Sequence, residues 1–374
     1  MNIQDRKIVQ RSKPDYPLIL ITAILVAFGL LMVFSATTVE SLHYGDPMFY
    51  FKKQIVYVFL GGLAMFAGYK IDYINYKKYS GLGLLIAGLM LLVVFLPVMG
   101  RSAGGAARWI DLGFFSFQPS EIAKIAVIIY LADALSKKGE KIKNFLTGLL
   151  PLLMVVGFFC VLILAQPDLG TVISIFLISM SMLFISGADW RHLLSIMFFS
   201  GIGIFTLSFL SPYKWRRIIA FIDPWNDPRG TGFHIIQSLI AIGSGGIFGF
   251  GLGNSRQKFM YLPEQYTDFI FAIVCEETGL FGAFLLIIFF IAFVSRCFRI
   301  CRGAPDRFSM LLAGGIASYI GIQAFINMCV ATSLLPTTGI PLPFISYGGT
   351  SLIITMFSVG ILLNISTYKN GQKK

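Results

Sequence analysis

PLILITAILVAFGLLMVFSA, residues 17–36, is a run of apolar residues without a charged side chain. A helix of about twenty residues is long enough to cross the hydrocarbon core of a bilayer. The run follows Arg6, Lys7, Arg11 and Lys13, and it is longer than the core of a typical signal peptide. Because more such runs follow, it predicts a helix that stays in the membrane.

The composition of the chain indicates the same class. Of 374 residues, 56% are hydrophobic and 13% are charged, and the mean hydropathy is +0.78. Soluble domains are roughly 45–50% apolar and 25% charged, so the composition is that of a membrane protein. The five cysteines are an odd number and lie mostly in apolar runs, which argues against a disulfide framework or a thiolate metal site.

Further apolar runs divide the chain into membrane spans. They predict an all-α integral membrane protein with ten transmembrane helices in a single polytopic domain, residues 1–374, without an internal repeat. Two spans are marginal, since one is short and another contains Glu121, Lys124 and Asp133. The expected spans are 17–36, 54–69, 80–99, 119–136, 145–165, 170–187, 192–210, 269–294, 309–335 and 344–366.

The distribution of Lys and Arg predicts the orientation of these spans. Nineteen lie in segments on the side of the N-terminus, and four lie in the short loops of the other side. Because cytoplasmic loops carry the excess of positive charge, both tails, 1–16 and 367–374, are predicted in the cytoplasm. The net charge of +12 is then mostly a signal of topology, and it indicates no nucleic acid partner.

One long segment, 211–268, is predicted outside the cell between the seventh and eighth spans. Long loops escape the charge rule, so its cations are free to bind a ligand, although a solvated basic face is an equal alternative. Within it, 233–242 predicts a short apolar helix, and the glycine-rich 243–253 predicts a re-entrant or interfacial element that lines a cavity. The glycines lack the Gly-Lys-Ser/Thr ending of a nucleotide-binding loop. The cations of the segment are Lys214, Arg216, Arg217, Arg229, Arg256 and Lys258.

The fourth expected span carries a pair of opposite charges. In QPSEIAK, residues 118–124, Glu121 and Lys124 are three residues apart and share a helix face. A charge at the centre of a span costs on the order of 2.5–3.5 kcal/mol, so such residues usually face the bundle interior and mark a functional site. A structural ion pair is the alternative.

Three carboxylates accompany the start of the eighth span. Asp268 either faces an aqueous cavity or caps a helix that begins at Phe269, although Phe271 at the N3 position supports no capping box. Glu276 and Glu277 lie roughly 12–13 Å further along the helix and on different sides of it. We expect both glutamates to hold a neighbouring helix or the glycine-rich stretch rather than to act chemically.

Together these features predict an outer cavity with one carboxylate at its mouth, basic residues and an intramembrane ion pair. A carboxylate there could act as a general base, and the cations could neutralise phosphate. The residues alone leave two classes open, an enzyme that acts on an anionic lipid-linked substrate and a proton-coupled transporter.

Five sequence blocks, in fixed order over nearly the whole chain, carry a family likeness. They are ARWIDLGFFSFQPSEIAK (107–124), QPDLGT (166–171), DPWNDPRGTGFHIIQSLIAIGSGGIFGFGLGNSRQK (223–258), YLPEQYTDFIFAIVCEETG (261–279) and GIPLPFISYGGTSL (339–352). These blocks resemble the SEDS family (shape, elongation, division, sporulation), most closely its FtsW and SpoVE branch. The resemblance implies ten transmembrane helices and a peptidoglycan glycosyltransferase that polymerises lipid II with a cognate class B penicillin-binding protein, the transpeptidase.

The resemblance also implies roles for single residues. The essential aspartate of the family's TDFIF motif falls on Asp268, and Arg108, Trp109, Glu121 and Lys124 match the RWI and QPSExxK motifs. The expected substrate-binding set is Arg108, Trp109, Glu121, Lys124, Lys214, Arg216, Arg217, His234, Gln237, Ser238, Lys258, Glu264 and Ser346.

The implied chemistry is a glycosyl transfer with inversion. Asp268 would take the proton of the acceptor sugar hydroxyl as that oxygen attacks the anomeric carbon of the donor and expels undecaprenyl pyrophosphate. Mg²⁺ or Mn²⁺, or the cations of the long segment, would neutralise the departing diphosphate. No metal ligand set can be read from the sequence, and no organic cofactor is expected.

The resemblance implies a location and partners as well. The protein is expected in the bacterial cytoplasmic membrane, with its active site on the extracytoplasmic face at the division septum. Its partners would be lipid II, the growing glycan strand, the transpeptidase and other division or sporulation membrane proteins.

Two other functions stay open. A lipid II flippase would share the topology and the anionic lipid, and a scaffold would only recruit the transpeptidase. An isolated aspartate at a cavity mouth argues against the scaffold, but it does not separate the polymerase from the flippase.

Overall fold

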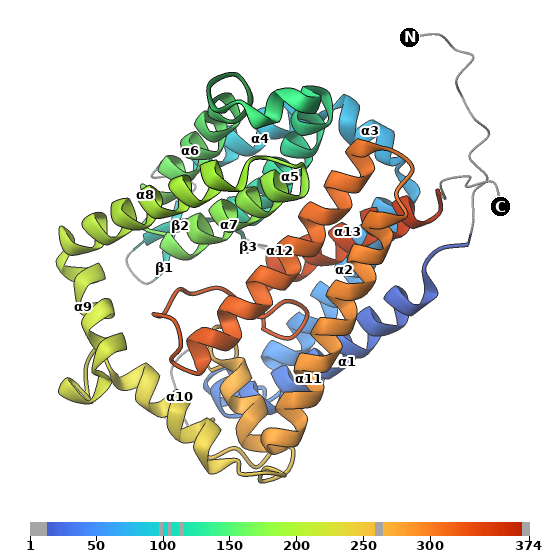
Figure 1. Ribbon diagram of the computed structural model, residues 1–374. Helices are drawn as coiled ribbons and strands as arrows, with labels where there is room; N and C mark the ends of the chain where they lie inside the picture. Colours follow the sequence, from blue (N-terminus) through green and yellow to red (C-terminus); the bar gives the residue numbers. More distant parts are fainter. Residues whose placement is uncertain (1–12, 97–99, 104–105, 112–115, 259–264, 369–374) are drawn as a thin grey trace.

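The computed structural model of the chain describes residues 13–96, 100–103, 106–111, 116–258 and 265–368. It is an α-helical bundle with one small sheet (Figure 1). Each of the ten expected apolar runs lies at least in part on a helix. These helices are α1 (Tyr16–Ser41), α2 (Phe49–Lys70), α4 (Ser80–Val93), α5 (Pro119–Lys138), α6 (Leu150–Leu164), α7 (Leu169–Ile185), α8 (Trp190–Phe209), α11 (Ile270–Arg302), α12 (Arg307–Ala331) and α13 (Gly349–Ser366).

Shorter elements connect these helices. The long segment after α8 contains two helices, of which the second was expected and the first was not. The shorter elements are η2 (Leu42–Tyr44), α3 (Tyr73–Lys78), η3 (Gly139–Lys143), η4 (Phe145–Leu149), α9 (Pro212–Ile222), η5 (Pro224–Asn226) and α10 (Phe233–Ser244).

Five helical stretches of the described residues are long and apolar enough to cross a membrane, judged by length and composition. The helices α4, α7 and α10 are apolar but shorter. The five long stretches are Tyr16–Tyr44, Phe145–Leu164, Ile270–Arg302, Arg307–Ala331 and Gly349–Ser366.

The centre of the bundle is formed by α12 and α13. Helix α12 packs against α5, α7 and α11, and α13 packs along α2. Glycines let the last two backbones approach, because a Cβ at Gly360 would overlap the main chain of Met65, and one at Gly68 the carbonyl of Phe357. The outer faces of α1, α4, α8 and α11 keep large apolar side chains exposed, as a lipid-facing surface does.

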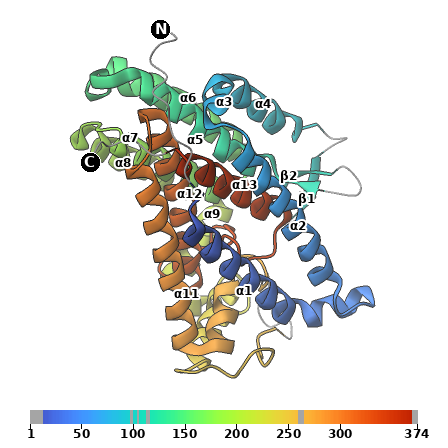
Figure 2. The ribbon, with the colours of Figure 1, turned by 90° about the vertical axis from the view of Figure 1, so that its right-hand side faces the viewer.

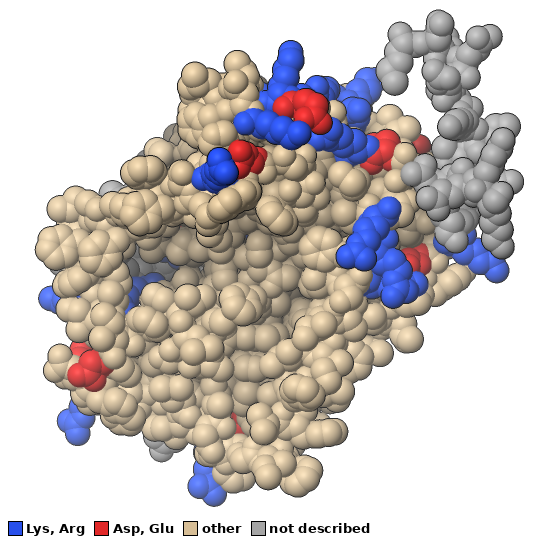
Figure 3. Space-filling view, in the orientation of Figure 1, with Lys and Arg blue, Asp and Glu red and all other residues tan. Residues whose placement is uncertain are grey.

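Both ends of the described chain lie at the same end of the bundle. The Asp15 N–H donates to Ser366 Oγ at 3.1 Å, and Arg296 Nε donates to Asp15 Oδ1 at 2.8 Å. In Figure 2, α1 lies between α11 and α2, both of which it contacts. Figure 3 shows Lys and Arg gathered at the end of the molecule near α3 and the last turns of α11, while the flank is almost free of charge.

The fold is all-α as expected, and one small sheet that was not expected accompanies the helices. The sheet has three short antiparallel strands between α4 and α5, β1 (Gly100–Ala103), β2 (Ala106–Asp111) and β3 (Ser116–Phe117), in the order β1-β2-β3. Strands of two to six residues are too short for a clear alternating pattern, so hydrophobicity gives no warning of them.

The connection between α12 and α13 also differs from the expected spans. Helix α12 ends at Ala331 and α13 begins at Gly349. The expected spans 309–335 and 344–366 therefore both extend into the connection between the two helices. The connection contains Pro336, Pro341 and Pro343, which lack the N–H that a helix needs. Residues 332–348 are called the α12–α13 segment below.

Candidate active site

Asp268 lies in a turn directly before α11. Helix α11 begins at Ile270 and its N-cap is Phe269, so the alternative that Asp268 is the cap is wrong. The Asp268 side chain is half-buried, and a Cβ built on Gly339 would lie 3.5 Å from its Oδ2 atom. The carboxyl group therefore lies beside the α12–α13 segment.

The residues just before Asp268 are tied to the same segment. The Tyr266 carbonyl accepts from the Tyr347 N–H at 2.8 Å, and the Thr267 carbonyl accepts from the Ser346 hydroxyl at 2.5 Å. The same Ser346 oxygen accepts from the Leu342 N–H at 2.8 Å, and Ser346 is 4% exposed. The hydroxyl of Ser346 is thus engaged inside the protein, and its contact with substrate stays a prediction.

Asn327 of α12 completes this arrangement. Its Nδ2 donates to the Asp268 carbonyl and to the Ile340 carbonyl, each at 2.8 Å. One buried amide group therefore connects the turn that carries Asp268 with the α12–α13 segment opposite.

Arg217 approaches the site from α9. Its guanidinium donates to the Thr337 carbonyl at 3.3 Å, two residues before Gly339. Figure 3 shows the surface hollowed beside α9, with basic side chains in the hollow. A cationic side chain is thus held near the segment that lies beside Asp268.

The other cations of α9 are less closely connected to Asp268. Arg216 is exposed, and Lys214 lies on α9 with its side chain outside the described part. The N–H of Thr231, followed by its hydroxyl, lowers the pKa of Asp227, and the charge of Arg216 adds to this effect. These contacts order the turns after α9 rather than the Asp268 turn.

Lys258 is directed towards the glycine-rich stretch. Its ammonium group donates to the Gly253 carbonyl, and its N–H donates to Ser255 Oγ at 3.2 Å. The residue is 9% exposed, so its expected contact with a diphosphate would require a rearrangement. Glu264 lies outside the described residues.

The three expected residues of α10 have different surroundings. The His234 ring stacks on the Phe269 ring, with 6.0 Å between centroids, which places it next to the Asp268 turn. The Ser238 hydroxyl is buried and donates to the Ala331 carbonyl at the end of α12 at 2.6 Å. Gln237 is half-buried.

Glu121 and Lys124 form the ion pair that their spacing predicts. Lys124 Nζ lies 2.7 Å from Glu121 Oε1, and the two residues are only 3% and 2% exposed. Lys124 also donates to Gln323 Oε1 at 3.2 Å, and Gln323 donates to the Pro341 carbonyl at 3.2 Å. The pair therefore faces the bundle interior and reaches the α12–α13 segment through α12.

Arg108 and Trp109 lie on β2. Arg108 donates through Nε to the Gln166 carbonyl at 3.1 Å and through its terminal nitrogen to the Pro167 carbonyl. Trp109 is half-buried and pairs with Arg101 across β1 and β2. Arg108 thus connects the sheet to the turn between α6 and α7.

Glu276 and Glu277 are buried and structural, as expected. Glu276 accepts from the Ser255 hydroxyl and from the Arg256 N–H at 2.9 Å. Glu277 accepts from the Ser255 N–H at 3.3 Å and from the Ser35 hydroxyl of α1 at 2.5 Å. The expectation that they point to different sides of the helix is corrected, because both converge on Ser255.

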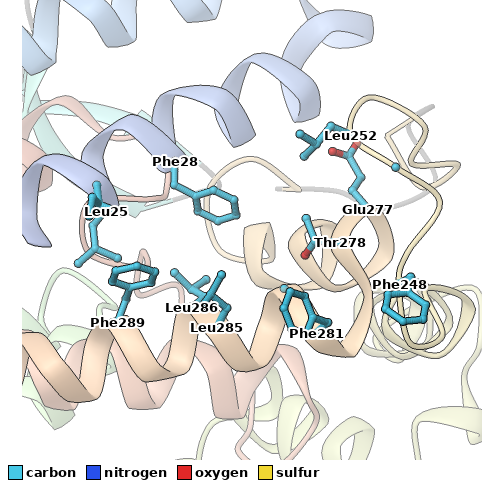
Figure 4. Close-up of a pocket in the computed structure, with 13 residues that line it drawn as sticks. Leu25, Phe28, Phe248, Leu252, Glu277, Thr278, Phe281, Leu285, Leu286 and Phe289 are labelled. Atoms are coloured by element: carbon cyan, nitrogen blue, oxygen red, sulfur yellow. The ribbon is translucent and has the colours of Figure 1, made fainter.

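An apolar groove of about 470 Å³ lies between α1 and α11. Figure 4 shows Phe28 and Phe289 facing each other across it, with Glu277 and Leu252 at one end. Residues 248–252 contribute Phe248, Gly251 and Leu252 to its wall. The re-entrant or interfacial character of the glycine-rich stretch stays a prediction.

Metal-binding side chains are not clustered in the described part of the chain. Within it, no group of three or more His, Cys, Asp or Glu residues is arranged to hold a metal ion.

Sequence reasoning missed Gln323 and Asn327. They lie four residues apart on α12, and both donate to neighbouring carbonyls of the α12–α13 segment. A signal was present, because two amide side chains at helical spacing interrupt the apolar run 309–335. The search for charged residues passed over them.

The chain is similar to known proteins over nearly its full length. The family described as cell cycle protein (FtsW, RodA, SpoVE) matches residues 16–371. The probable peptidoglycan glycosyltransferase FtsW of Geobacter sp. (strain M18) is 43% identical over 358 residues, which are 96% of this chain and 98% of the relative. Stage V sporulation protein E of Bacillus subtilis (strain 168) is 43% identical over 360 residues, with the same two coverages.

Solved structures have the same fold. A chain from a structure described as "Structural coordination of polymerization and crosslinking by a peptidoglycan synthase complex" superposes with a TM-score of 0.80 at 30% identity, covering 96% of this chain and 99% of that one. The rod shape determining protein RodA of Thermus thermophilus superposes with a TM-score of 0.72 at 27% identity, covering 96% and 98%. The chain therefore belongs to the FtsW, RodA and SpoVE family of cell cycle proteins.

Proposed function

We propose that this protein is a peptidoglycan glycosyltransferase that polymerises lipid II into glycan strands, with Asp268 as the general base. The observation that carries the proposal is the half-buried carboxyl group of Asp268 in a turn held through successive main-chain carbonyls. A base must be held in place if it is to meet a substrate hydroxyl at hydrogen-bond distance. The relatives named peptidoglycan glycosyltransferase support the same activity.

In the proposed reaction, a sugar hydroxyl of the acceptor attacks the anomeric carbon of the donor. Asp268 takes the hydroxyl proton, the new glycosidic bond forms with inversion, and the bond to undecaprenyl pyrophosphate breaks. The leaving group departs with the electron pair and needs its negative charge neutralised. Arg217, held beside the α12–α13 segment, is the best-supported cation for this task, and Lys214, Arg216 and Lys258 complete the proposed set.

The proposed topology has ten transmembrane helices, cytoplasmic termini and an extracytoplasmic segment 211–268. The contact between Asp15 and Ser366 supports it, because an even number of spans returns the chain to the side from which it began. The excess of Lys and Arg on that side supports the orientation. The active site would then lie on the extracytoplasmic face of the bacterial inner membrane, at the division septum.

The proposed partners follow from the reaction. They are lipid II, the growing glycan strand, a cognate class B penicillin-binding protein and other division or sporulation membrane proteins. The similarity to a chain of a peptidoglycan synthase complex supports the transpeptidase partner. Mg²⁺ or Mn²⁺ would be held largely by substrate phosphates, and we assign no step to it.

The test is polymerisation of lipid II by the purified complex with its transpeptidase. Asp268→Asn keeps the shape of the side chain but removes the base, so we expect a loss of rate of at least about 100-fold with binding of lipid II retained. Asp223→Asn, an exposed carboxylate of the same long segment, is the matched control and should polymerise at the wild-type rate. Normal polymerisation by Asp268→Asn would refute the base assignment.

A lipid II flippase is the second candidate. The buried pair of Glu121 and Lys124 favours it, since intramembrane charges also serve transport. A flippase would move labelled lipid II across proteoliposomes without its partner, and Asp268→Asn would alter that movement. Polymerisation without translocation would exclude this candidate.

A further inference from the structure

Asn327 is a buried amide within an otherwise apolar part of α12. It is 1% exposed, and its Nδ2 donates two hydrogen bonds of 2.8 Å, one to the Asp268 carbonyl and one to the Ile340 carbonyl. The two acceptors belong to segments far apart in sequence, one before α11 and the other after α12.

The two segments that Asn327 joins are the two that meet at the Asp268 carboxyl group. Ile340 follows Gly339, and a Cβ built on Gly339 would lie 3.5 Å from Asp268 Oδ2. Gly339 has a φ of +73°, a conformation that a residue with a side chain rarely adopts, so the backbone approaches Asp268 without a side chain between them. The amide of Asn327 therefore sets the separation between Asp268 and the backbone beside it.

The other ties of the Asp268 turn hold its preceding residues. Ser346 and Tyr347 bind the carbonyls of Thr267 and Tyr266, and they reach the turn from within the α12–α13 segment. Asn327 acts from a helix, and it holds the carbonyl of Asp268 itself. Its hydrogen bond is therefore made to the residue that carries the carboxyl group.

The oxygen of the same amide indicates that Asn327 lowers the stability of the folded protein. Among the described residues, Asn327 Oδ1 is buried and has no hydrogen-bond partner. An unsatisfied buried acceptor is unfavourable, and an apolar side chain of similar shape would avoid it. The two hydrogen bonds that Asn327 donates therefore explain its presence better than packing of the core does.

We propose that Asn327 is a positioning residue of the glycosyl transfer, which holds Asp268 in the place where it meets the acceptor hydroxyl. The inference rests on the proposed function of Asp268. It assigns no contact between Asn327 and substrate, so loss of the amide should lower the turnover number and leave the KM for lipid II unchanged.

The experiment compares Asn327→Leu with Asn364→Leu in the full chain, in complex with its transpeptidase. Asn364 is a matched control, because it is 5% exposed and its amide also makes two main-chain hydrogen bonds, donating to the Tyr69 carbonyl at 2.7 Å and accepting from the Tyr73 N–H at 3.0 Å. It lies at the other end of the bundle. Both variants lose a buried amide, so both are expected to melt at a lower temperature.

The kinetic result separates the two variants. Since a small misplacement of a catalytic group can cost about 100-fold in rate, we expect kcat of folded Asn327→Leu to fall about 10- to 100-fold with an unchanged KM. Folded Asn364→Leu should keep the wild-type kcat. The proposal would be overturned if the two variants had the same kcat, or if Asn327→Leu changed only the KM.

Two further variants keep the test decisive. If Asn327→Leu fails to fold, Asn327→Ser keeps a polar side chain that is too short to make both amide hydrogen bonds, and a lower kcat with unchanged KM is again expected. A normal kcat of folded Asn327→Ser in that case would overturn the proposal. Asp268→Asn, measured in parallel, separates the two hypotheses: if it is inactive while Asn327→Leu is normal, only the positioning role fails, and if it is active, both fail.

Discussion

Asp268 and the two glutamates that follow it differ in what surrounds them. Asp268 is half-buried beside a glycine, whereas Glu276 and Glu277 are 1% exposed and accept hydrogen bonds from residues of the long segment. A carboxylate that several donors surround is committed to structure, because a change in its charge would break those bonds. Chemistry is therefore expected of Asp268 alone among the three.

This difference predicts the effect of neutralising Glu276. In the wild type, main-chain N–H groups donate to the Glu276 carboxylate, whereas in Glu276→Gln an amide nitrogen would face one of these donors. We therefore expect the free energy of unfolding to fall by about 2–4 kcal/mol. Thermal unfolding in detergent measures this loss of stability. The control is Glu140→Gln, which removes a solvent-exposed pair with Lys143 and should change nothing measurable. An unchanged melting temperature with lost polymerisation would assign Glu276 to the chemistry instead.

At the scale of elements, α11 is broken near its start. Gly279 has φ 67° and ψ −170° within the helix, and the glycine-rich stretch fills the break. Phe250 N–H donates to the Glu276 carbonyl at 3.1 Å, and Leu280 N–H donates to the Gly246 carbonyl at 2.9 Å. A Cβ on Gly279 would overlap the backbone of Gly249. The glycines therefore allow two backbones to exchange hydrogen bonds at close range.

The break predicts opposite outcomes at two glycines of this region. Gly279→Ala combines a positive φ with a backbone clash, and should destabilise the fold by about 2 kcal/mol or more. Gly243→Ala lies in α10 with open space around it and should be neutral or slightly stabilising, since alanine favours a helix. Melting temperatures of the two variants check this. A stable Gly279→Ala would mean that the break is not required.

The ion pair between Glu121 and Lys124 is an interaction between elements, because it connects α5 to α12. Removal of one partner leaves a buried charge, so Lys124→Met or Glu121→Gln alone should destabilise the protein by about 3–5 kcal/mol. The double variant removes both charges and should recover most of the loss. A double-mutant cycle of thermal unfolding measures this coupling.

The double variant also addresses the role of the pair. If it is as stable as the wild type but does not polymerise lipid II, the pair serves the reaction beyond its contribution to packing. If the double variant loses as much stability as the two single variants added together, the two charges do not stabilise each other.

At the scale of the whole molecule, charged residues gather at one end of the bundle and apolar residues cover its flank. The ends of the described chain meet through Asp15 and Ser366, and Lys and Arg gather at that end (Figure 3). The flank exposes large apolar residues of α1, α4, α8 and α11. This division supports the proposed topology, in which both tails lie on the cytoplasmic side of the bilayer.

The proposed topology predicts which residues a membrane-impermeant maleimide reaches. In a chain whose five cysteines are replaced, Asn226→Cys lies in the exposed turns after α9 and should be labelled in intact cells. Glu140→Cys, also exposed, should be labelled only after the membrane is permeabilised. Labelling of both, or of Glu140→Cys alone, would contradict the orientation.

The site was predictable in part. The pair of Glu121 and Lys124 and the buried contacts of the two glutamates could be foreseen, because charged groups in apolar sequence are costly and must have partners. The role of Asp268 as the base stays a prediction. Asn327 was visible as an amide in an apolar run, but its acceptors at Asp268 and Ile340 could not be predicted, since they lie 59 and 13 residues away. Hydrogen bonds between a side chain and a distant carbonyl leave no spacing pattern.

The sequence by itself determined that this is a membrane protein and where its long apolar helices lie, and it predicted how its charges divide between two sides. Those properties follow from hydrophobic length and local composition, which act within one segment at a time. The tertiary structure alone decided that Gly339 lies beside Asp268, that Asn327 holds both of their segments and that two glutamates converge on Ser255. These contacts depend on how helices rotate and pack against one another, and residues far apart in the chain meet only when the whole bundle has formed.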